Sequence, residues 1–591
     1  MTAAEAVALV RPGDRVWVGS ACGSPTTLLA ALHALPTPVP GVRLVHFLAN
    51  GVTLDGAVRY PQEVLFVGSE LRGLARGGLV DYVPVSLSEV PSLIARGQHR
   101  VDVAMVQVAP PDEHGMCSLG VSVDVTLAAA QRARTVLAEV NPRMPRTGPA
   151  TGLPVDRIDA FVEVDGPVQE YSHQPVGPAA EAIAQYVARL VPDGATLQIG
   201  LGRVPNAMLR HLSGRRDLSV HSDVVTDGLV DLLDGGAVRA GPGSVVSSMA
   251  VGTRRLFERL STPEVDFQPL EQLASPSTVG GLDRLVSVTQ AFAVDLTGQV
   301  CADTDAGELY GGVASQSVMH RAAAHSSGGR AVVCLTTLFD DGSSRIRPVL
   351  EPEEAVTIPR ADVHYVVTEY GTAYLFGRSL RERAVALIEL AHPSMRQQLL
   401  HQAISRGLVP PTQELRSRGA YLREEERTVA LRDGRTVLVR PARTGDAPLL
   451  QDLFYRMPPD DVYTRFFRHL TSLPLSTAEH MTSVSFEDEV TLLAVEGDWG
   501  SERVVGTVSY VRDPTSGRAD VAFMVDPQWK GHGLGTALRD VVVDVGRRHS
   551  VVAFTADVLA ENTAMLRVFR SSGLDLEVQT SHGVSEFVLT L

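Results

Sequence analysis

Short apolar runs alternate with segments of helical periodicity along the first 175 residues. Residues 14–20, 42–48, 63–69, 101–109 and 135–141 are strand-like runs rich in valine, leucine and alanine. Between them, segments such as residues 25–35 place apolar side chains at helical spacing. Strands that alternate with helices predict a largely parallel sheet covered on both faces.

A second alternating block begins near Pro178. Residues 179–191 have the pattern of a helix, and residues 195–200 that of a buried strand. The alternation continues to a long helical stretch at 379–391. We therefore expect two α/β halves, residues 1–175 and 176–415, which meet near residues 170–185.

A polar and charged segment follows, and we place a linker at residues 416–427. After it the pattern restarts with strand-like runs at 435–442, 490–497, 503–511 and 520–526 and a helical run at 446–454. A chain of 591 residues is too long for one core. Residues 428–591 are thus expected to form a separate α+β domain.

Composition narrows the function classes. A net charge of −15 disfavours a nonspecific nucleic-acid binder, which needs a cationic surface. No apolar run approaches the ~18 residues that a membrane span needs. The four cysteines are far apart, with no CxxC pair and no Cys/His cluster, so we expect no metal and a reduced, cytoplasmic protein. Lys530 is the only lysine, which we attribute first to genome composition.

A glycine-rich loop at residues 530–535 lies between the last of these strands and a helix expected to start near Thr536. Gly531, Gly533 and Gly535 let the backbone approach a polyanion closely. The free N–H groups of the following helix suit a pyrophosphate. About 25 residues further on, Asn562 stands at an expected helix start, with Met565, Leu566 and Phe569 as an apolar stripe.

This order of strand, loop, helix, strand and Asn562 helix resembles the GNAT acetyltransferase superfamily over residues 428–591. The strand VLVRPAR (437–443) is similar to the start of the protein-lysine acetyltransferase branch. The resemblance implies acetyl transfer from acetyl-CoA to an amine without a covalent intermediate. It further implies that the backbone of Val525 meets the acetyl or pantetheine group, and that the remaining acetyl-CoA contacts come from Lys530, Gly531, His532, Gly533, Leu534, Gly535, Thr536 and Asn562.

The resemblance also implies a general base at the start of the strand before the loop. That position carries Asp520 where lysine acetyltransferases of this branch carry glutamate. Aspartate is one methylene shorter, so a bridging water is expected between it and the amine. The alternative is that Asp520 is a solvated carboxylate at the end of a strand.

Seven ordered segments resemble another family, the acetyl-CoA hydrolase/transferase family of CoA-transferases, across residues 1–415. They are residues 19–25, 108–126, 138–147, 198–209, 292–304, 308–316 and 366–393. In this family a glutamate attacks the acyl-CoA thioester and becomes acylated. The resemblance places that glutamate at the position of Ala293, so we expect the family mechanism to be absent at this position.

Other carboxylates lie close to Ala293 in the sequence. Asp295 lies two residues along the same strand, so its side chain points to the same face, but the Thr-Gly pair that follows favours a turn-forming role. Asp303 and Glu308 are also close, and nothing in the sequence fixes their geometry. By the same resemblance, Gly200, Gly202 and Gly371 belong to an intact CoA-holding region. A lone His114 and a lone Cys22 are more typical of structural residues than of catalytic ones.

The sequence thus predicts a two-halved CoA-transferase-like α/β region followed by an α+β GNAT domain. The expected function is acetyl-CoA-dependent N-acetylation, with protein lysine as acceptor and a CoA-transferase-like module that binds acyl-CoA. The alternatives are an acetyl-CoA hydrolase or acetate CoA-transferase with an accessory GNAT domain, and a non-catalytic acyl-CoA sensor. Acetyl-CoA or CoA is the expected substrate, a protein or small amine the acceptor, and a homo-oligomer the expected assembly.

Overall fold

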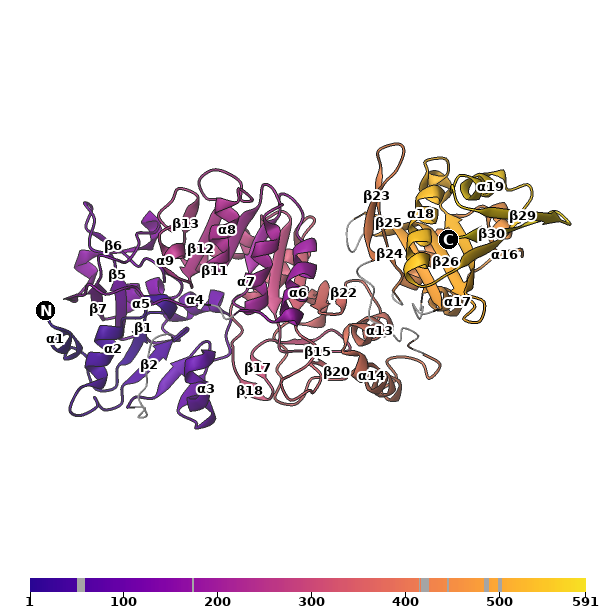
Figure 1. Ribbon diagram of the computed structural model, residues 1–591. Helices are drawn as coiled ribbons and strands as arrows, with labels where there is room; N and C mark the ends of the chain where they lie inside the picture. Colours follow the sequence, from indigo (N-terminus) through magenta and orange to yellow (C-terminus); the bar gives the residue numbers. More distant parts are fainter. Residues whose placement is uncertain are drawn as a thin grey trace. The chain divides into compact units, whose positions relative to one another are not determined.

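The computed structural model describes residues 1–49, 59–172, 175–413, 415, 425–443, 446–482, 488–497 and 502–591. The chain divides into two compact units, Met1–Gly377 and Arg378–Leu591 (Figure 1). Most of the expected linker, residues 416–424, lies outside the described residues.

The first half of unit 1 is built on a parallel sheet, as the alternating pattern predicts. Its strand order within the described residues is β4-β3-β2-β1-β5-β7-β9, and every pairing is parallel. The strands are β1 (Arg15–Val18), β2 (Arg43–His46), β3 (Gln62–Val64), β4 (Val80–Tyr82), β5 (Val103–Val108), β7 (Thr135–Val140) and β9 (Ala160–Glu163). A small sheet pairs β6 (Met116–Ser118) with β8 (Gly152–Pro154). The helices are α1 (Ala3–Val7), α2 (Thr26–His33), α3 (Gly68–Arg76), α4 (Val90–Ala95) and α5 (Thr126–Arg132).

The second half of unit 1 repeats this design. Its main sheet has the order β13-β12-β11-β10-β14-β19-β21-β22, and only the β21–β22 pairing there is antiparallel. The strands are β10 (Thr196–Ile199), β11 (Ser219–Val225), β12 (Val245–Ala250), β13 (Val265–Phe267), β14 (Leu285–Gln290), β19 (Arg330–Cys334), β21 (Tyr365–Thr368) and β22 (Gly371–Tyr374).

Helices and short strands complete this half. The helices are α6 (Pro178–Arg189), α7 (Arg203–Leu209), α8 (Gly228–Asp234), α9 (Arg254–Phe257), α10 (Leu270–Leu273), α11 (Pro276–Gly280) and α12 (Gln316–His325). The short strands are β15 (Ala293–Asp295), β16 (Val300–Cys301), β17 (Thr304–Asp305), β18 (Glu308–Leu309) and β20 (Ile346–Arg347).

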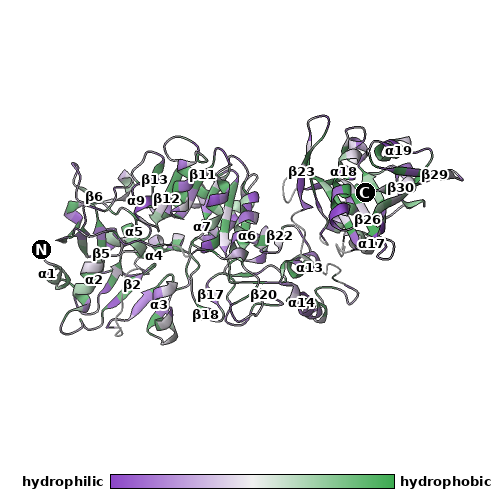
Figure 2. Cartoon of the chain, viewed as in Figure 1, coloured by the Kyte–Doolittle hydropathy of each residue, from purple (hydrophilic) through white to green (hydrophobic). Residues whose placement is uncertain are grey.

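Backbone hydrogen bonds join the two halves of unit 1. The N–H of Val123 donates to Ser248 O, and the N–H of Ala250 donates to Val121 O. On another part of the contact, the N–H of Leu87 donates to Ala314 O. The strands inside both halves are largely hydrophobic (Figure 2), so each sheet carries its own core and the contact between halves adds polar bonds.

Unit 2 contains a mostly antiparallel sheet of order β23-β24-β25-β26-β27-β28-β30-β29. The strands are β23 (Arg427–Ala430), β24 (Thr436–Pro441), β25 (Glu489–Glu496), β26 (Arg503–Arg512), β27 (Arg518–Val525), β28 (Ala553–Leu559), β29 (Leu576–Ser581) and β30 (Val584–Thr590). The helices are α13 (Leu380–Leu390), α14 (Pro393–Ser405), α15 (Ala447–Arg456), α16 (Pro459–Phe466), α17 (Leu475–Thr482), α18 (Leu534–Arg548) and α19 (Thr563–Arg570).

The end of the expected linker is structured. β23 begins at Arg427, inside the stretch expected to connect the domains, and Arg548 forms an ion pair with the buried carboxylate of Glu425. Residues 425–427 therefore belong to the folded domain. A polar sequence looked like a linker because its charged side chains have partners far along the chain.

Two apolar cores lie on opposite faces of this sheet. Side chains of a strand alternate between faces, and on β27 Val521 packs in one core while Met524 packs in the other. The first core contains Leu534 and Leu538 of α18. The second contains Leu450 of α15. The sheet is thus covered on both faces, with α18 and α15 on opposite sides.

A buried ion pair fixes the start of α15 against β24. Arg440 is fully buried, and its Nη1 and Nη2 donate to the Asp446 carboxylate at 2.7 and 2.9 Å. Glu502 lies 3.5 Å from the same guanidinium. Burial by itself raises the pKa of Asp446, but the charge and hydrogen bonds of Arg440 outweigh it and hold that pKa below its usual value.

Asp446→Ala is expected to destabilise unit 2 by on the order of 3 kcal/mol, because it removes the main counter-charge of a buried guanidinium. The matched variant Asp544→Ala, which breaks the more exposed pair with Arg427, should cost less than about 1 kcal/mol. Urea unfolding of the full chain measures both. The pKa of Asp446 is lower in the folded than in the unfolded protein. Its contribution to the free energy of unfolding is therefore fully present above the unfolded pKa of about 3.9 and is lost as pH falls through the folded pKa. Equal losses for the two variants would contradict this account.

Candidate functional site

A gap in strand pairing opens beside the glycine loop of unit 2. β27 and β28 run parallel and pair only at Arg518–Asp520 with Ala553–Thr555. Both strands continue beyond these pairs, to Val525 and Leu559. β27 therefore leaves one edge unpaired along its second half, from residue 521 to the loop.

The backbone of Val525 is directed toward this open edge. The N–H of Asp526 donates to Val505 O on β26, and successive N–H groups of a strand point to opposite edges. The N–H of Val525 accordingly points away from β26, toward the side where β28 has separated. This is the geometry that the contact expected of Val525 requires.

The loop after β27 ends in an uncapped helix. Gly531 and Gly533 have φ values of +82° and +94°, a region that disfavours residues with a Cβ. Gly533 is the N-cap of α18 and makes no side-chain capping bond. The first intrahelical bond runs from Ala537 N to Gly533 O, so Leu534, Gly535 and Thr536 have N–H groups without an intrahelical acceptor. Uncapped helix starts of this kind are places where proteins can bind anions.

Two basic side chains of the loop already have carboxylate partners. The ammonium of Lys530 forms an ion pair with Asp461 of α16. The Nδ1 of His532 lies 2.8 Å from Asp433 Oδ2 in the β23–β24 turn. The phosphate contact expected of Lys530 would therefore require its ammonium to leave Asp461.

Leu534 and Asn562 each have a structural task. Leu534 is buried in the core of the domain, so only its backbone is available to a ligand. Asn562 is the N-cap of α19, and its Oδ1 accepts from Met565 N at 3.1 Å. This confirms the expected helix start and leaves the amide nitrogen of Asn562 for other contacts.

Asp520 lies on the sheet face opposite α18, at the point where the strands separate. Thr555 is its partner on β28, and Asp557 lies two residues further on, on the same face. Partial burial raises the pKa of Asp520, the charge of Asp557 raises it further, and Arg465 of α16 lowers it. Asp557 and Arg465 were not identified from the sequence, because only the strand register brings them to Asp520.

Gly200 and Gly202 of unit 1 are required by close packing. A Cβ at Gly200 would lie 2.9 Å from Val288 O, and one at Gly202 would lie 2.9 Å from Gln290 Oε1. The N–H of Val204, in the first turn of α7, donates to that same Gln290 Oε1 at 3.2 Å. The side chain of Gln290 therefore caps an amide in the first turn of α7, within the region that the resemblance assigns to CoA binding.

Asp223, a carboxylate that sequence reasoning missed, lies on β11, the strand next to β10. The two strands pair at Thr196↔Ser219 and Leu197↔Val220, and Asp223 and Gly200 each lie three residues beyond the second of these pairs. β11 and β14 lie on opposite sides of β10 in the sheet, which makes the carboxyl end of β10 a topological switch point where open α/β sheets bind ligands. Burial raises the pKa of Asp223, and the side chains of Ser315 and Gln198 lower it in part.

A row of buried polar side chains leads to Asp223. Ser287 Oγ donates to Gln198 Oε1 at 2.6 Å and lies 2.8 Å from His320 Nδ1. Because the hydroxyl has one hydrogen, His320 Nδ1 must be the donor to Ser287. Burial lowers the pKa of His320 to about 3, so the ring is neutral. The row runs from α12 across β14 and β10 and ends where Gln198 hydrogen-bonds to Asp223.

Asp295, the carboxylate nearest to Ala293 in the sequence, orders a turn. Ala293 is a fully buried residue of β15. Asp295 Oδ1 accepts from Thr297 N and Oγ1 and from Gln299 N, and Oδ2 accepts from Gln299 Nε2. These bonds agree with the turn-forming role expected of Asp295. Asp303 is buried, and Glu308 lies on the short strand β18.

Gly371 and Cys22 also have structural explanations. Gly371 has a φ of +136° and opens β22, where it pairs with Thr368 in a tight connection from β21. Burial raises the pKa of the Cys22 thiol to about 12, so it is not a thiolate nucleophile at neutral pH.

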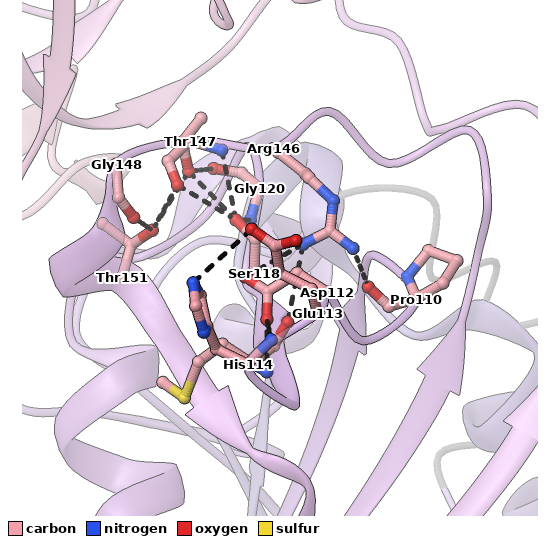
Figure 3. A network of polar contacts seen from close by, with 11 residues as sticks. Pro110, Asp112, Glu113, His114, Ser118, Gly120, Arg146, Thr147, Gly148 and Thr151 are labelled. Atoms are coloured by element: carbon pink, nitrogen blue, oxygen red, sulfur yellow. Dashed lines mark hydrogen bonds and ion pairs between the residues drawn. The ribbon is translucent and has the colours of Figure 1, made fainter.

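His114 lies in an exposed loop, as Figure 3 shows. Its ring is 78% exposed and lies 3.6 Å from Glu113. Asp112 Oδ1 accepts from the backbone N–H of His114 and of Met116. Beside this loop, Ser118 Oγ accepts from Thr147 N at 3.1 Å, which joins two of the seven segments. The network thus orders a turn.

Comparison with known proteins identifies both parts of the chain. The acetyl-CoA hydrolase/transferase N-terminal domain matches residues 1–166, and the C-terminal domain of the same family matches residues 252–403. A 4-hydroxybutyrate coenzyme A transferase of Clostridium kluyveri is 37% identical, over 68% of this chain and 96% of that protein. The chain belongs to the acetyl-CoA hydrolase/transferase family.

A solved structure agrees with this assignment. RipA from Yersinia pestis has a TM-score of 0.65 and 33% identity, and the match covers 69% of this chain and 98% of RipA. The C-terminal part matches the acetyltransferase (GNAT) domain at residues 436–575. An acetyltransferase of Pseudomonas aeruginosa is 25% identical over 23% of this chain and 73% of its own length. This member of the acetyl-CoA hydrolase/transferase family therefore carries a GNAT domain, and both parts belong to families that use CoA substrates.

Across the described ranges, no group of three or more His, Cys, Asp or Glu side chains is arranged to hold a metal ion. In the same part of the chain, no helix combines the length and the apolar character needed to cross a bilayer.

The glycines of the GNAT loop should differ in their tolerance of a side chain. Gly533→Ala is expected to destabilise unit 2 by about 1–3 kcal/mol, because its positive φ strains a residue with a Cβ. Gly535→Ala should change stability by less than about 1 kcal/mol, since its Cβ would meet Val568 at an ordinary 3.5 Å. Urea unfolding distinguishes the two. A larger loss for Gly535→Ala than for Gly533→Ala would overturn this interpretation.

Proposed function

We propose that the GNAT domain transfers an acetyl group from acetyl-CoA directly to an amine, with a protein lysine side chain as the acceptor. The observation that carries the proposal is the separation of β27 from β28 beside the uncapped start of α18. The helix amides suit the pyrophosphate, and the open edge of β27 suits the pantetheine arm. The acetyl carbonyl then accepts a hydrogen bond from the N–H of Val525.

Asp520 is the proposed general base. The acceptor ammonium loses a proton to its carboxylate, through a water because aspartate is short. The free amine attacks the thioester carbonyl, the C–S bond breaks, and the CoA thiolate leaves and takes up a proton. The raised pKa of Asp520 makes it a stronger base than an ordinary aspartate. A cationic acceptor is favoured because Asp520 and Asp557 both place negative charge at this opening.

Asp520→Asn is expected to lower kcat/KM for acetyl transfer by about 10²–10⁴-fold, since it removes the base and keeps the size of the side chain. The assay follows labelled acetyl groups from acetyl-CoA into poly-L-lysine with the full chain, and Asp544→Asn on the exposed face of α18 is the matched control. Asp557→Asn should move the acidic limb of the pH profile to lower pH, because the charge of Asp557 raises the pKa of Asp520. Full activity of Asp520→Asn would rule out the base.

The acetyl-CoA hydrolase/transferase region supports a second function, CoA transfer between carboxylic acids. The observation that favours it is Asp223, a carboxylate with a raised pKa at the switch point of the second sheet. Asp223 is a candidate for the different nucleophile that the loss of a carboxylate at Ala293 would require. The relatives named as CoA transferases make this function preferable to a silent acyl-CoA sensor.

The proposed reaction at Asp223 balances without a further reactant. Its carboxylate attacks the acyl-CoA carbonyl, and the CoA thiolate leaves to give a mixed anhydride. The thiolate then attacks the aspartyl carbonyl of the anhydride and releases the first acid. A second acid attacks the resulting aspartyl-CoA thioester, and the returning thiolate forms the new acyl-CoA and restores Asp223.

Asp223→Asn is expected to lower the exchange of labelled acetate into acetyl-CoA by about 10³-fold, equivalent to about 4 kcal/mol of barrier. The amide cannot carry the acyl group, and its size leaves the packing around β11 intact. Asp520→Asn should keep this exchange, while Asp223→Asn should keep acetyl transfer to poly-L-lysine. Absence of exchange in the unmodified chain would instead favour the sensor.

A further inference from the structure

The turn between β23 and β24 is fixed onto the glycine loop of the GNAT domain. Oδ2 of Asp433 in this turn lies 2.8 Å from Nδ1 of His532 in the loop. The guanidinium of Arg435 lies over the ring of Trp529, 4.1 Å from its centroid. Leu431 is buried in the core that also holds Leu534 of α18. Three independent contacts thus hold this turn beside residues 529–534.

Arg432 of this turn lies along the start of α18. A Cβ built on Gly533 would be 3.3 Å from its Cγ, 3.5 Å from its Cδ and 3.7 Å from its Nε. The stem of Arg432 therefore runs past Gly533, the N-cap of α18, at the end of the helix where the first amides lack an intrahelical acceptor. The side chain is exposed, and among the described residues no carboxylate is recorded as its ion-pair partner.

Arg432 is better placed to bind an anionic ligand than the other basic side chains near the loop, because those side chains already have carboxylate partners. Lys530 is paired with Asp461, His532 with Asp433, and Arg435 with Asp433 at 2.7 Å. Arg432 can meet an anion without first breaking such a pair. A guanidinium also matches two phosphate oxygens at once, which an ammonium cannot do.

We propose that Arg432 binds a phosphate of CoA at the start of α18, and that the β23–β24 turn is part of the acetyl-CoA site. This rests on the proposed function of the GNAT domain. CoA offers two such groups, the pyrophosphate and the 3′-phosphate. Glycine at position 533 is then favoured for two reasons: it adopts the positive φ, and its lack of a Cβ leaves room for the stem of Arg432.

The test measures hydrogen–deuterium exchange of residues 530–540 in the full chain, titrated with CoA, 3′-dephospho-CoA and pantetheine. This segment reports on the GNAT site alone, although the acetyl-CoA hydrolase/transferase region also takes CoA. For Arg432→Ala, the CoA concentration for half-maximal protection should rise about tenfold. Arg547→Ala, an exposed arginine in the last turn of the same helix, should leave it unchanged, and Arg432→Lys should fall between the two.

The ligands distinguish the two phosphates. If the tenfold penalty persists with 3′-dephospho-CoA, Arg432 binds the pyrophosphate, and if it disappears, Arg432 binds the 3′-phosphate. Equal protection of the unmodified chain and Arg432→Ala by CoA would overturn the assignment and leave the acetyl-CoA site standing. No protection of the unmodified chain by CoA would overturn the proposed function, and the assignment with it.

Discussion

The proposed acetyl-CoA site depends on how far β27 and β28 pair. The two parallel strands pair only at Arg518–Asp520 with Ala553–Thr555. While β27 and β28 pair, their backbone groups satisfy each other. Once they separate, the edge of β27 has N–H and C=O groups that need new partners. Acetyl-CoA, the proposed ligand, would pair with these groups as an additional β-strand does. The position of Asp520 at the last pair places its carboxylate where the opening begins.

The two parts of the chain use carboxylates in different surroundings. Asp520 lies at an open edge, near a second acid and an arginine, and its proposed task is to accept a proton. Asp223 lies on β11 with Gln198 and Ser315 close by, and its proposed task is to accept an acyl group. Burial raises both pKa values, so the surroundings rather than the residue type determine which chemistry is proposed.

Local patterns predicted much of this arrangement. The alternation of strands and helices predicted the two largely parallel sheets, and the loop at 530–535 with the Asn562 cap indicated the GNAT domain. Asp223 was not predicted because a single acid inside the strand SVHSDVV has no local sequence signature. The polar row that leads to it, Gln198, Ser287 and His320, comes from three other elements. The pairing of Lys530 with Asp461 and the position of Arg432 near Gly533 were not predicted for the same reason, since Asp461 and the β23–β24 turn approach the loop only in the folded domain.

We propose that one chain combines direct acetyl transfer in its GNAT domain with transfer through a covalent carboxylate intermediate in its acetyl-CoA hydrolase/transferase region. The most direct test incubates the full chain with acetyl-CoA, quenches it, and maps hydroxylamine-labile adducts by peptide mass spectrometry. The account predicts an acyl or CoA adduct on the peptide containing Asp223 and no labile adduct in residues 428–591. An unmodified Asp223 peptide under conditions of acetate exchange, or a labile acyl group on the GNAT domain, would contradict it.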